Sequence, residues 1–204
     1  MEKNKDAEKD IINAARKIFY NKGFKETTMR DIAAEANTNL ALVNYYFRSK
    51  ENLFYIIYDE SIMIFFNKLL TCFEKKDTDV KEKIKSIISE YLDFFIGNPH
   101  IPNFIMGEVI RNPQSVSSRI NENLKKNNIL MVFEQQIQNE IKAGLIKPVS
   151  AISIFMNILS LVLFPIISKP IMQEAFHLTP SQFNDFIVSR KQEITDIIIN
   201  SIKT

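Results

Sequence analysis

Apolar residues recur at three- and four-residue intervals along most of this chain, and this period constrains the fold more than any other feature. Such spacing gathers apolar side chains on one face of an α-helix, whereas a half-buried β-strand requires strict alternation. We find no convincing alternating segment, and only 4 of the 204 residues are glycine. The sequence therefore predicts an all-α protein that is long enough to bury a substantial core.

Glycine, proline and capping residues divide this pattern into separate helices. Gly23 predicts the end of the first helix, Thr27 or Thr28 can cap the second, and Ser49 can cap a long fourth. Between them, Asn37 and Thr38 predict a tight break, because asparagine tolerates a left-handed backbone. The expected helices span residues 6–21, 29–36, 40–46, 49–75, 80–96, 102–111, 117–143, 149–167 and 180–202, with a polar linker at 75–79.

Composition limits the class of protein. Apolar residues make up 46% and charged residues 25%, which is ordinary for a soluble globular protein. The single cysteine, Cys72, excludes an intrachain disulfide, and the charged N-terminus lacks the apolar run of a secretory signal, so we expect a cytoplasmic protein. Residues 1–50 carry a net charge of +3 on a chain of +2. A mildly basic head fits phosphate binding, but chance variation explains so small a difference equally well.

The helices expected at 29–36 and 40–46, joined by a short break, have the helix-turn-helix arrangement. Val43 and Phe47 lie four residues apart and predict the buried side of the second of these helices. Asn44 can hydrogen-bond to base edges, and the tyrosine hydroxyls can reach phosphates. The candidate DNA-binding residues are Thr27, Thr28, Asn39, Leu40, Ala41, Leu42, Asn44, Tyr45, Tyr46 and Lys50. A plain helical hairpin within a bundle is the alternative; polar and aromatic residues on so short a helix favour DNA binding.

The segment AARKIFYNKGFKETTMRDIAAEANTNLALVNYYFRSKENLF resembles the DNA-binding domain of the tetracycline-repressor (TetR) family, over about Ile11 to Phe54. The matching features occur in the family's order: Gly23-Phe24, Thr27-Thr28, Asp31-Ile32-Ala33, Tyr46-Phe47 and Ser49-Lys50-Glu51. The chain departs from the family at Asn37, where glycine is common, and at Leu40, where a basic or small polar residue is usual. Asn37 can adopt the same turn, whereas Leu40 alters one expected contact with DNA.

The resemblance implies a three-helix DNA-binding head at residues 1–48 and a larger helical effector-binding and dimerisation domain at 49–204. The helix at 49–75 would connect the two. Proteins of this kind are usually homodimeric repressors that a small molecule releases from operator DNA. The resemblance therefore predicts a dimeric, ligand-responsive repressor that binds double-stranded operator DNA.

The C-terminal helices supply a candidate dimer interface. The last helix has an apolar stripe, consisting of Phe183, Phe186, Ile187, Arg190, Ile194, Ile197 and Ile198. Two such helices per subunit could form a four-helix interface about a two-fold axis, although packing within one chain would use the same stripe. Residues 149–167 contain no charge, but a membrane span is disfavoured because Ser150, Ser153, Asn157 and Ser160 would be costly in lipid.

Aromatic residues in the middle helices suggest an apolar effector cavity with a few orienting polar groups. The candidates are Tyr91, Phe95, Phe104, Glu108, Arg111, Phe133 and Asn157. Ordinary core packing explains each aromatic residue equally well, and Glu108 and Arg111 have the spacing of a structural ion pair. The effector is expected to be a largely apolar small molecule.

Catalysis is not indicated. His100 and His177 are far from any metal-type spacing, Cys72 has no evident partner base, and no glycine-rich phosphate loop occurs. We therefore expect neither an enzyme nor a bound metal or cofactor. A helical binding module that has lost DNA binding and a membrane-associated helical protein remain alternatives to the regulator.

Overall fold

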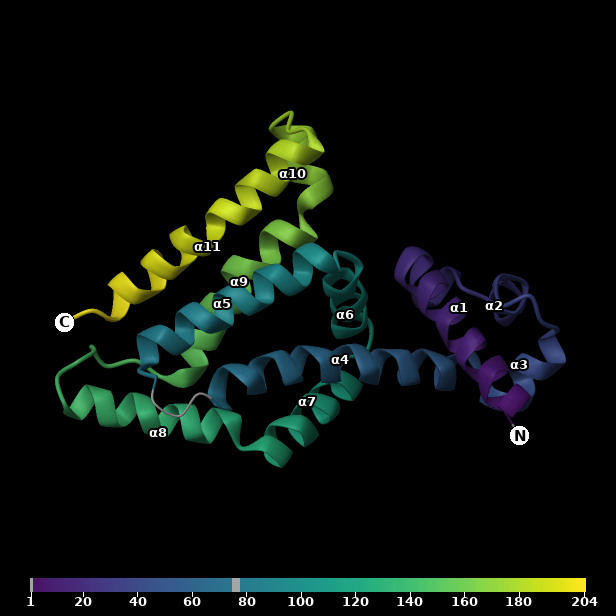
Figure 1. The fold of residues 1–204 in the computed structure, drawn as a ribbon, viewed down its shortest axis with the longest axis horizontal. Coiled ribbons are helices and arrows are strands. Elements are labelled where there is room, and N and C mark those ends of the chain that lie inside the picture. Colours follow the sequence, from purple (N-terminus) through teal and green to yellow (C-terminus); the bar gives the residue numbers. More distant parts are fainter. Residues whose placement is uncertain (1, 75–77) are drawn as a thin grey trace. The chain divides into compact units, whose positions relative to one another are not determined.

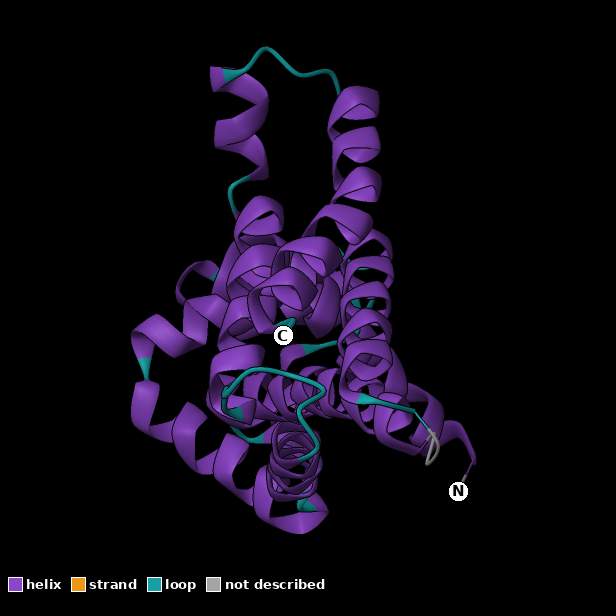
Figure 2. Ribbon diagram, turned by 90° about the vertical axis from the view of Figure 1, so that its left-hand side faces the viewer, coloured by secondary structure: helices purple, strands orange, loops and turns teal. Residues whose placement is uncertain are grey.

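The computed structural model describes residues 2–74 and 78–204, which form α-helices joined by loops (Figures 1 and 2). The helices are α1 (Glu2–Glu26), α2 (Met29–Glu35), α3 (Leu40–Phe47), α4 (Lys50–Glu74), α5 (Val80–Gly97), α6 (His100–Arg111), α7 (Pro113–Asn127), α8 (Ile129–Lys142), α9 (Ala151–Ile167), α10 (Lys169–Ala175) and α11 (Pro180–Ile202). An isolated antiparallel bridge joins Ile146 to Lys203. The predicted all-α class is confirmed.

The chain divides into two compact units. The N-terminal unit comprises Met1–Ile64 and Asn103–Arg119, and the C-terminal unit comprises Phe65–Pro102 and Ile120–Thr204. This division differs from the boundary expected after residue 48. The start of α4 and most of α6 belong with the head because their aromatic rings share one core, with the rings of Phe54 and Phe104 only 5.1 Å apart.

Two helix predictions are wrong in detail. The single helix expected at 117–143 is two helices, because Asn128 takes a left-handed conformation with φ of 50° between α7 and α8. A short helix, α10, follows α9 after Ser168 and was not expected from the sequence.

The stop predicted at Gly23 is confirmed by its φ of 71°, although a last helical turn continues to Glu26. Residues 75–77 of the expected linker lie outside the described residues.

Helix α11 packs against α5 and α9 in the core of the C-terminal unit. Its residues Phe183, Ile187, Ile194 and Ile198 are at most 2% exposed. These four were predicted to form a dimer interface, and that prediction is wrong because their side chains are buried within their own chain. Of the same set, Phe186 and Arg190 are half-buried, and Ile197 is 48% exposed.

The apolar segment at 149–167 corresponds closely to α9, with Ser150 as its N-cap. Within the described residues, no single helix has both the length and the hydropathy needed to cross a bilayer. Helices α9 and α10 meet that requirement only when taken together, and they are bent by 62° at the break between them.

Candidate nucleic-acid interface

The N-terminal unit is held together by an aromatic core. The ring of Phe54 in α4 lies 5.2 Å from Phe19, 4.9 Å from Phe24, 5.7 Å from Tyr58 and 5.1 Å from Phe104, measured between ring centroids. Edge-to-face and offset arrangements at these distances are favourable beyond the area they bury. Phe54 therefore joins α1, α4 and α6, while α2 packs against α1 and α3 packs against α2.

A capping box begins α2. The Thr28 hydroxyl accepts a hydrogen bond from the Asp31 backbone N–H at 3.1 Å, and the Asp31 carboxylate accepts one from the Thr28 N–H at 2.9 Å. These bonds satisfy backbone donors that a helix start would leave unpaired. The hydrogen bonds from Thr28, together with the charge of Lys22, lower the pKa of Asp31.

The break between α2 and α3 turns at Asn37, whose φ is 48°. The Asn37 N–H donates to the Ala34 carbonyl, and the Thr38 N–H donates to the Ala33 carbonyl at 2.9 Å. Asparagine is among the few residues that adopt this conformation readily. The predicted left-handed turn at Asn37 is confirmed, and it sets the angle between the two helices.

Helix α3 presents two different faces. Val43 and Phe47 are 0% and 4% exposed and pack inward, as predicted. Asn39 caps the helix by accepting a hydrogen bond from the Leu42 N–H at 2.8 Å. Ala41, Asn44 and Tyr45 lie on the exposed side, with Tyr45 75% exposed. Leu40, Leu42 and Tyr46 are half-buried along the edges of this face. The arrangement leaves a short helix open to a partner along one side.

Two of the predicted DNA-contact residues form hydrogen bonds inside the protein. Thr27 is 1% exposed, and its hydroxyl donates to the Gly23 carbonyl at 2.7 Å. The Lys50 ammonium donates to the carbonyls of Phe24 and Thr27 at 3.0 and 2.9 Å, and it lies 4.3 Å from the Phe24 ring. The start of α4 is therefore bonded to the segment between α1 and α2. Thr28 is exposed, but its hydroxyl is engaged in the capping box.

Two basic residues near this face were not among the predicted contacts. Arg30 lies in the first turn of α2, and Arg48 follows α3 with a positive φ of 62°. Both are exposed, and neither forms an ion pair with another described residue. In contrast, Lys17 is paired with Glu35 at 2.5 Å. Arg30 and Arg48 could have been identified from the sequence, because they are basic residues at the start of the first helix of the motif and at the end of the second.

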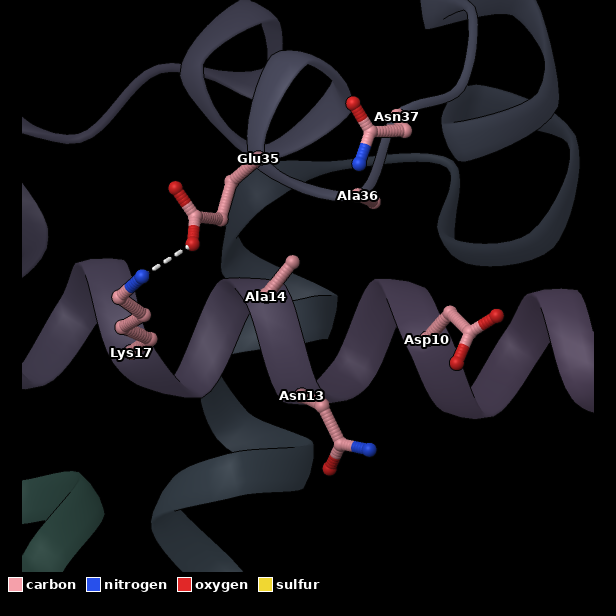
Figure 3. A pocket seen from close by; sticks show the side chains of 7 residues that line it. All are labelled: Asp10, Asn13, Ala14, Lys17, Glu35, Ala36 and Asn37. Carbon is pink, nitrogen blue, oxygen red and sulfur yellow. Dashed lines mark hydrogen bonds and ion pairs between the residues drawn. The ribbon is translucent and has the colours of Figure 1, made fainter.

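A shallow polar hollow lies beside this region, between α1 and the end of α2 (Figure 3). Ala14 and Ala36 face each other there, and the small side chains allow the two helices to approach. The ion pair between Lys17 and Glu35 closes one end of the hollow. We interpret these residues as packing that holds α2 in place, because the small side chains and the ion pair join the two helices.

The predicted effector residues do not form one group. Phe104, Glu108 and Arg111 belong to the N-terminal unit, while Tyr91, Phe95, Phe133 and Asn157 belong to the C-terminal unit. The fully buried Glu108 carboxylate accepts hydrogen bonds from the Arg111 guanidinium and, at 2.9 Å, from the Tyr55 hydroxyl. Asn157 is exposed. The predicted effector residues thus lie in both units, and Glu108 and Arg111 form bonds that join α4 and α6 within the head.

Known proteins share both the sequence of this region and the fold. Residues 11–55 match the family described as bacterial regulatory proteins of the tetR family. The transcriptional repressor NicS of Pseudomonas putida is 26% identical over 116 residues, 57% of this chain, so the match spans only 53% of that relative. The fatty acid metabolism regulator protein of Bacillus subtilis is 28% identical over 138 residues, covering 66% of this chain and 71% of the relative.

A solved structure extends the similarity to the whole fold. The transcriptional regulator FadR from Bacillus subtilis, in complex with stearoyl-CoA, superimposes with a TM-score of 0.66, covering 93% of this chain and 96% of that one, at 19% sequence identity. The family match lies on the helices that present the exposed face of α3, and the helical C-terminal part has a counterpart in this structure. Residues 11–55 therefore match the DNA-binding part of the TetR family of bacterial regulatory proteins, and the chain shares its fold with a solved transcriptional regulator.

Proposed function

We propose that this protein is a dimeric repressor that binds operator DNA through α3 and leaves it when a small molecule binds the C-terminal unit. It would act in the cytoplasm, where such DNA is accessible. The observation that carries the proposal is the exposed side of α3, held by buried Val43 and Phe47 and bearing Ala41, Asn44 and Tyr45. A helix presented in this way can enter the major groove. Selecting bound duplexes from a random pool tests it, and failure to bind any duplex at low salt would refute it.

Within this face, we assign base reading to Asn44. Its exposed carboxamide can donate and accept, which suits the edge of an adenine. We expect Asn44→Ala to weaken binding to the selected operator by about 1–3 kcal/mol, with a much smaller effect on unrelated duplexes. Fluorescence anisotropy on both duplexes measures the difference. An equal loss on both would show that Asn44 does not read sequence.

Phosphate contacts are assigned to Arg48 and Arg30, which flank the exposed face. Arg48→Ala should weaken binding to all duplexes similarly and reduce the slope of log affinity against log salt by about 0.9. Lys142→Ala removes the same charge from an exposed position of the C-terminal unit and serves as the control. If both variants change the slope equally, net charge rather than a local contact is responsible.

For the dimer, the outer face of α9 supports a revised interface. Ile152, Met156 and Phe164 are 61%, 56% and 69% exposed and lie at multiples of four residues along the helix. Such a row of apolar side chains on one helix face is unusual on a monomer surface and typical of an interface. We propose that a second copy of the chain covers this face, with Ile197 of α11 as a further contact. Two copies would allow two α3 helices to contact successive major grooves.

A further inference from the structure

One face of α5 carries a nearly buried lysine, Lys83, and a buried tyrosine, Tyr91. Lys83, Ile87, Tyr91 and Phe95 follow one another at four-residue steps, so they lie along one side of the helix. Lys83 is 5% exposed and Tyr91 is 1% exposed. At 1.5 Å per residue, the two positions are about 12 Å apart along the helix axis.

The Lys83 side chain is nearly buried and forms no ion pair with another described residue. Its Nζ lies 5.5 Å from the centre of the Phe73 ring. Glu140 of α8, which lies near the start of α5, is bound instead to the Val80 N–H and the Gln136 amide. A charge removed from water without a partner is unfavourable, so this position favours an anion from outside the chain.

The Tyr91 hydroxyl is buried and has no hydrogen-bond partner among the described residues. Its ring stacks on Phe65 at 4.6 Å and contacts Phe95 at 6.0 Å. Burial raises the pKa of Tyr91 well above its ordinary value, so the hydroxyl stays protonated and is available as a donor. An unpaired buried hydroxyl is unfavourable, and an acceptor on a bound ligand would remove this cost.

Aromatic rings provide the apolar surroundings of both groups. Near Lys83, Phe73 of α4, Phe133 of α8 and Phe155 of α9 pack together, with centroid distances of 5.1 to 6.5 Å. Phe73 and Phe155 are only half-buried, as is Phe65 beside Tyr91, so this aromatic lining is partly accessible. Apolar walls with a few polar groups are typical of small-molecule sites.

We propose that the C-terminal unit binds an elongated apolar carboxylate, with Lys83 holding the carboxylate and Tyr91 donating a hydrogen bond to a second acceptor farther along the molecule. The carboxylate would be the effector of the regulator, and that regulatory role rests on the proposed function. The binding itself depends only on α5 and the aromatic residues around it.

Calorimetric titration with three probes tests the assignment: decanoate, ω-hydroxydecanoate and the neutral decanol. The intact chain should bind decanoate at least tenfold more tightly than decanol. Lys83→Met should remove this preference, reducing affinity for both carboxylates about tenfold or more and leaving decanol unchanged. Lys85→Met, at an exposed position on the same helix, is the matched control and should retain the preference.

Tyr91→Phe isolates the second contact. It should reduce affinity for ω-hydroxydecanoate about three- to tenfold and leave decanoate unaffected, because only the former carries an acceptor for the hydroxyl. Thermal unfolding confirms that each variant is folded. Absence of carboxylate binding, equal affinity for decanoate and decanol, or equal behaviour of the two lysine variants would overturn the proposal.

A mobility shift of the same preparations, without probe, separates this inference from the proposed function. Duplex binding without carboxylate binding would refute the ligand assignment alone. Carboxylate binding with the predicted variant effects, but no duplex binding, would refute the DNA-binding role alone.

Discussion

Phe54→Ala is expected to destabilise the N-terminal unit by about 3–5 kcal/mol, which is much of the total stability of a typical domain. The Phe54 ring is 2% exposed and contacts five other aromatic rings from α1, α4 and α6. Its removal would leave a cavity that rigid rings cannot fill. Urea unfolding followed by circular dichroism measures the loss, and operator binding should fall with it because α2 and α3 lose their support.

The matched control is Ile56→Ala, two residues further along α4. Ile56 is 38% exposed, so its truncation should cost less than about 1 kcal/mol and leave operator binding intact. If both variants lose a similar amount of stability, α4 tolerates no side-chain truncation, and the loss is not specific to the aromatic core around Phe54. Retention of full stability by Phe54→Ala would contradict the packing described here.

The second large effect is expected from Phe164→Lys on the outer face of α9. A two-fold interface contains each residue twice, so a loss of about 2 kcal/mol per copy weakens the dimer by about 4 kcal/mol, or roughly a thousandfold. Sedimentation should show a monomer at concentrations where the original chain is a dimer. Operator affinity should fall strongly, since one α3 helix then binds a single half-site.

Met131→Lys provides the control for the dimer prediction. Met131 is 66% exposed on α8 and is also apolar, but it lies outside the proposed interface. This variant should remain dimeric and bind operator normally. If Phe164→Lys is still dimeric, the α9 face is not the interface; if Met131→Lys is monomeric, the interface includes α8.

Local features of the head could be predicted from the sequence because they depend on neighbouring residues. The stop at Gly23, the turn at Asn37, the cap at Thr28 and the buried pair Val43 and Phe47 each follow from backbone preference or helical spacing. The bonds that Thr27 and Lys50 form inside the protein could not be predicted, for a different reason. Their partners are the Gly23 carbonyl and the carbonyls of Phe24 and Thr27, and a carbonyl leaves no signal in the residue pattern.

The C-terminal half shows a second limit of prediction from residue spacing. The stripe on α11 was correctly identified as apolar, but spacing does not say which surface covers it, and α5 and α9 of the same chain do so. Glu108 and Arg111 were likewise expected to contact an effector. They instead bind each other and Tyr55, a residue more than fifty positions away, which no local pattern could indicate.

The division of the chain has a practical consequence for engineering. A fragment ending near residue 48 would contain the whole helix-turn-helix motif and yet lack Phe54, Tyr58 and Phe104, which complete its core. Phe19 and Phe24 would then be exposed to water. The helix-turn-helix motif is therefore not an independent folding unit. A chimaeric regulator that contains it must also include the first half of α4 and residues 103–119.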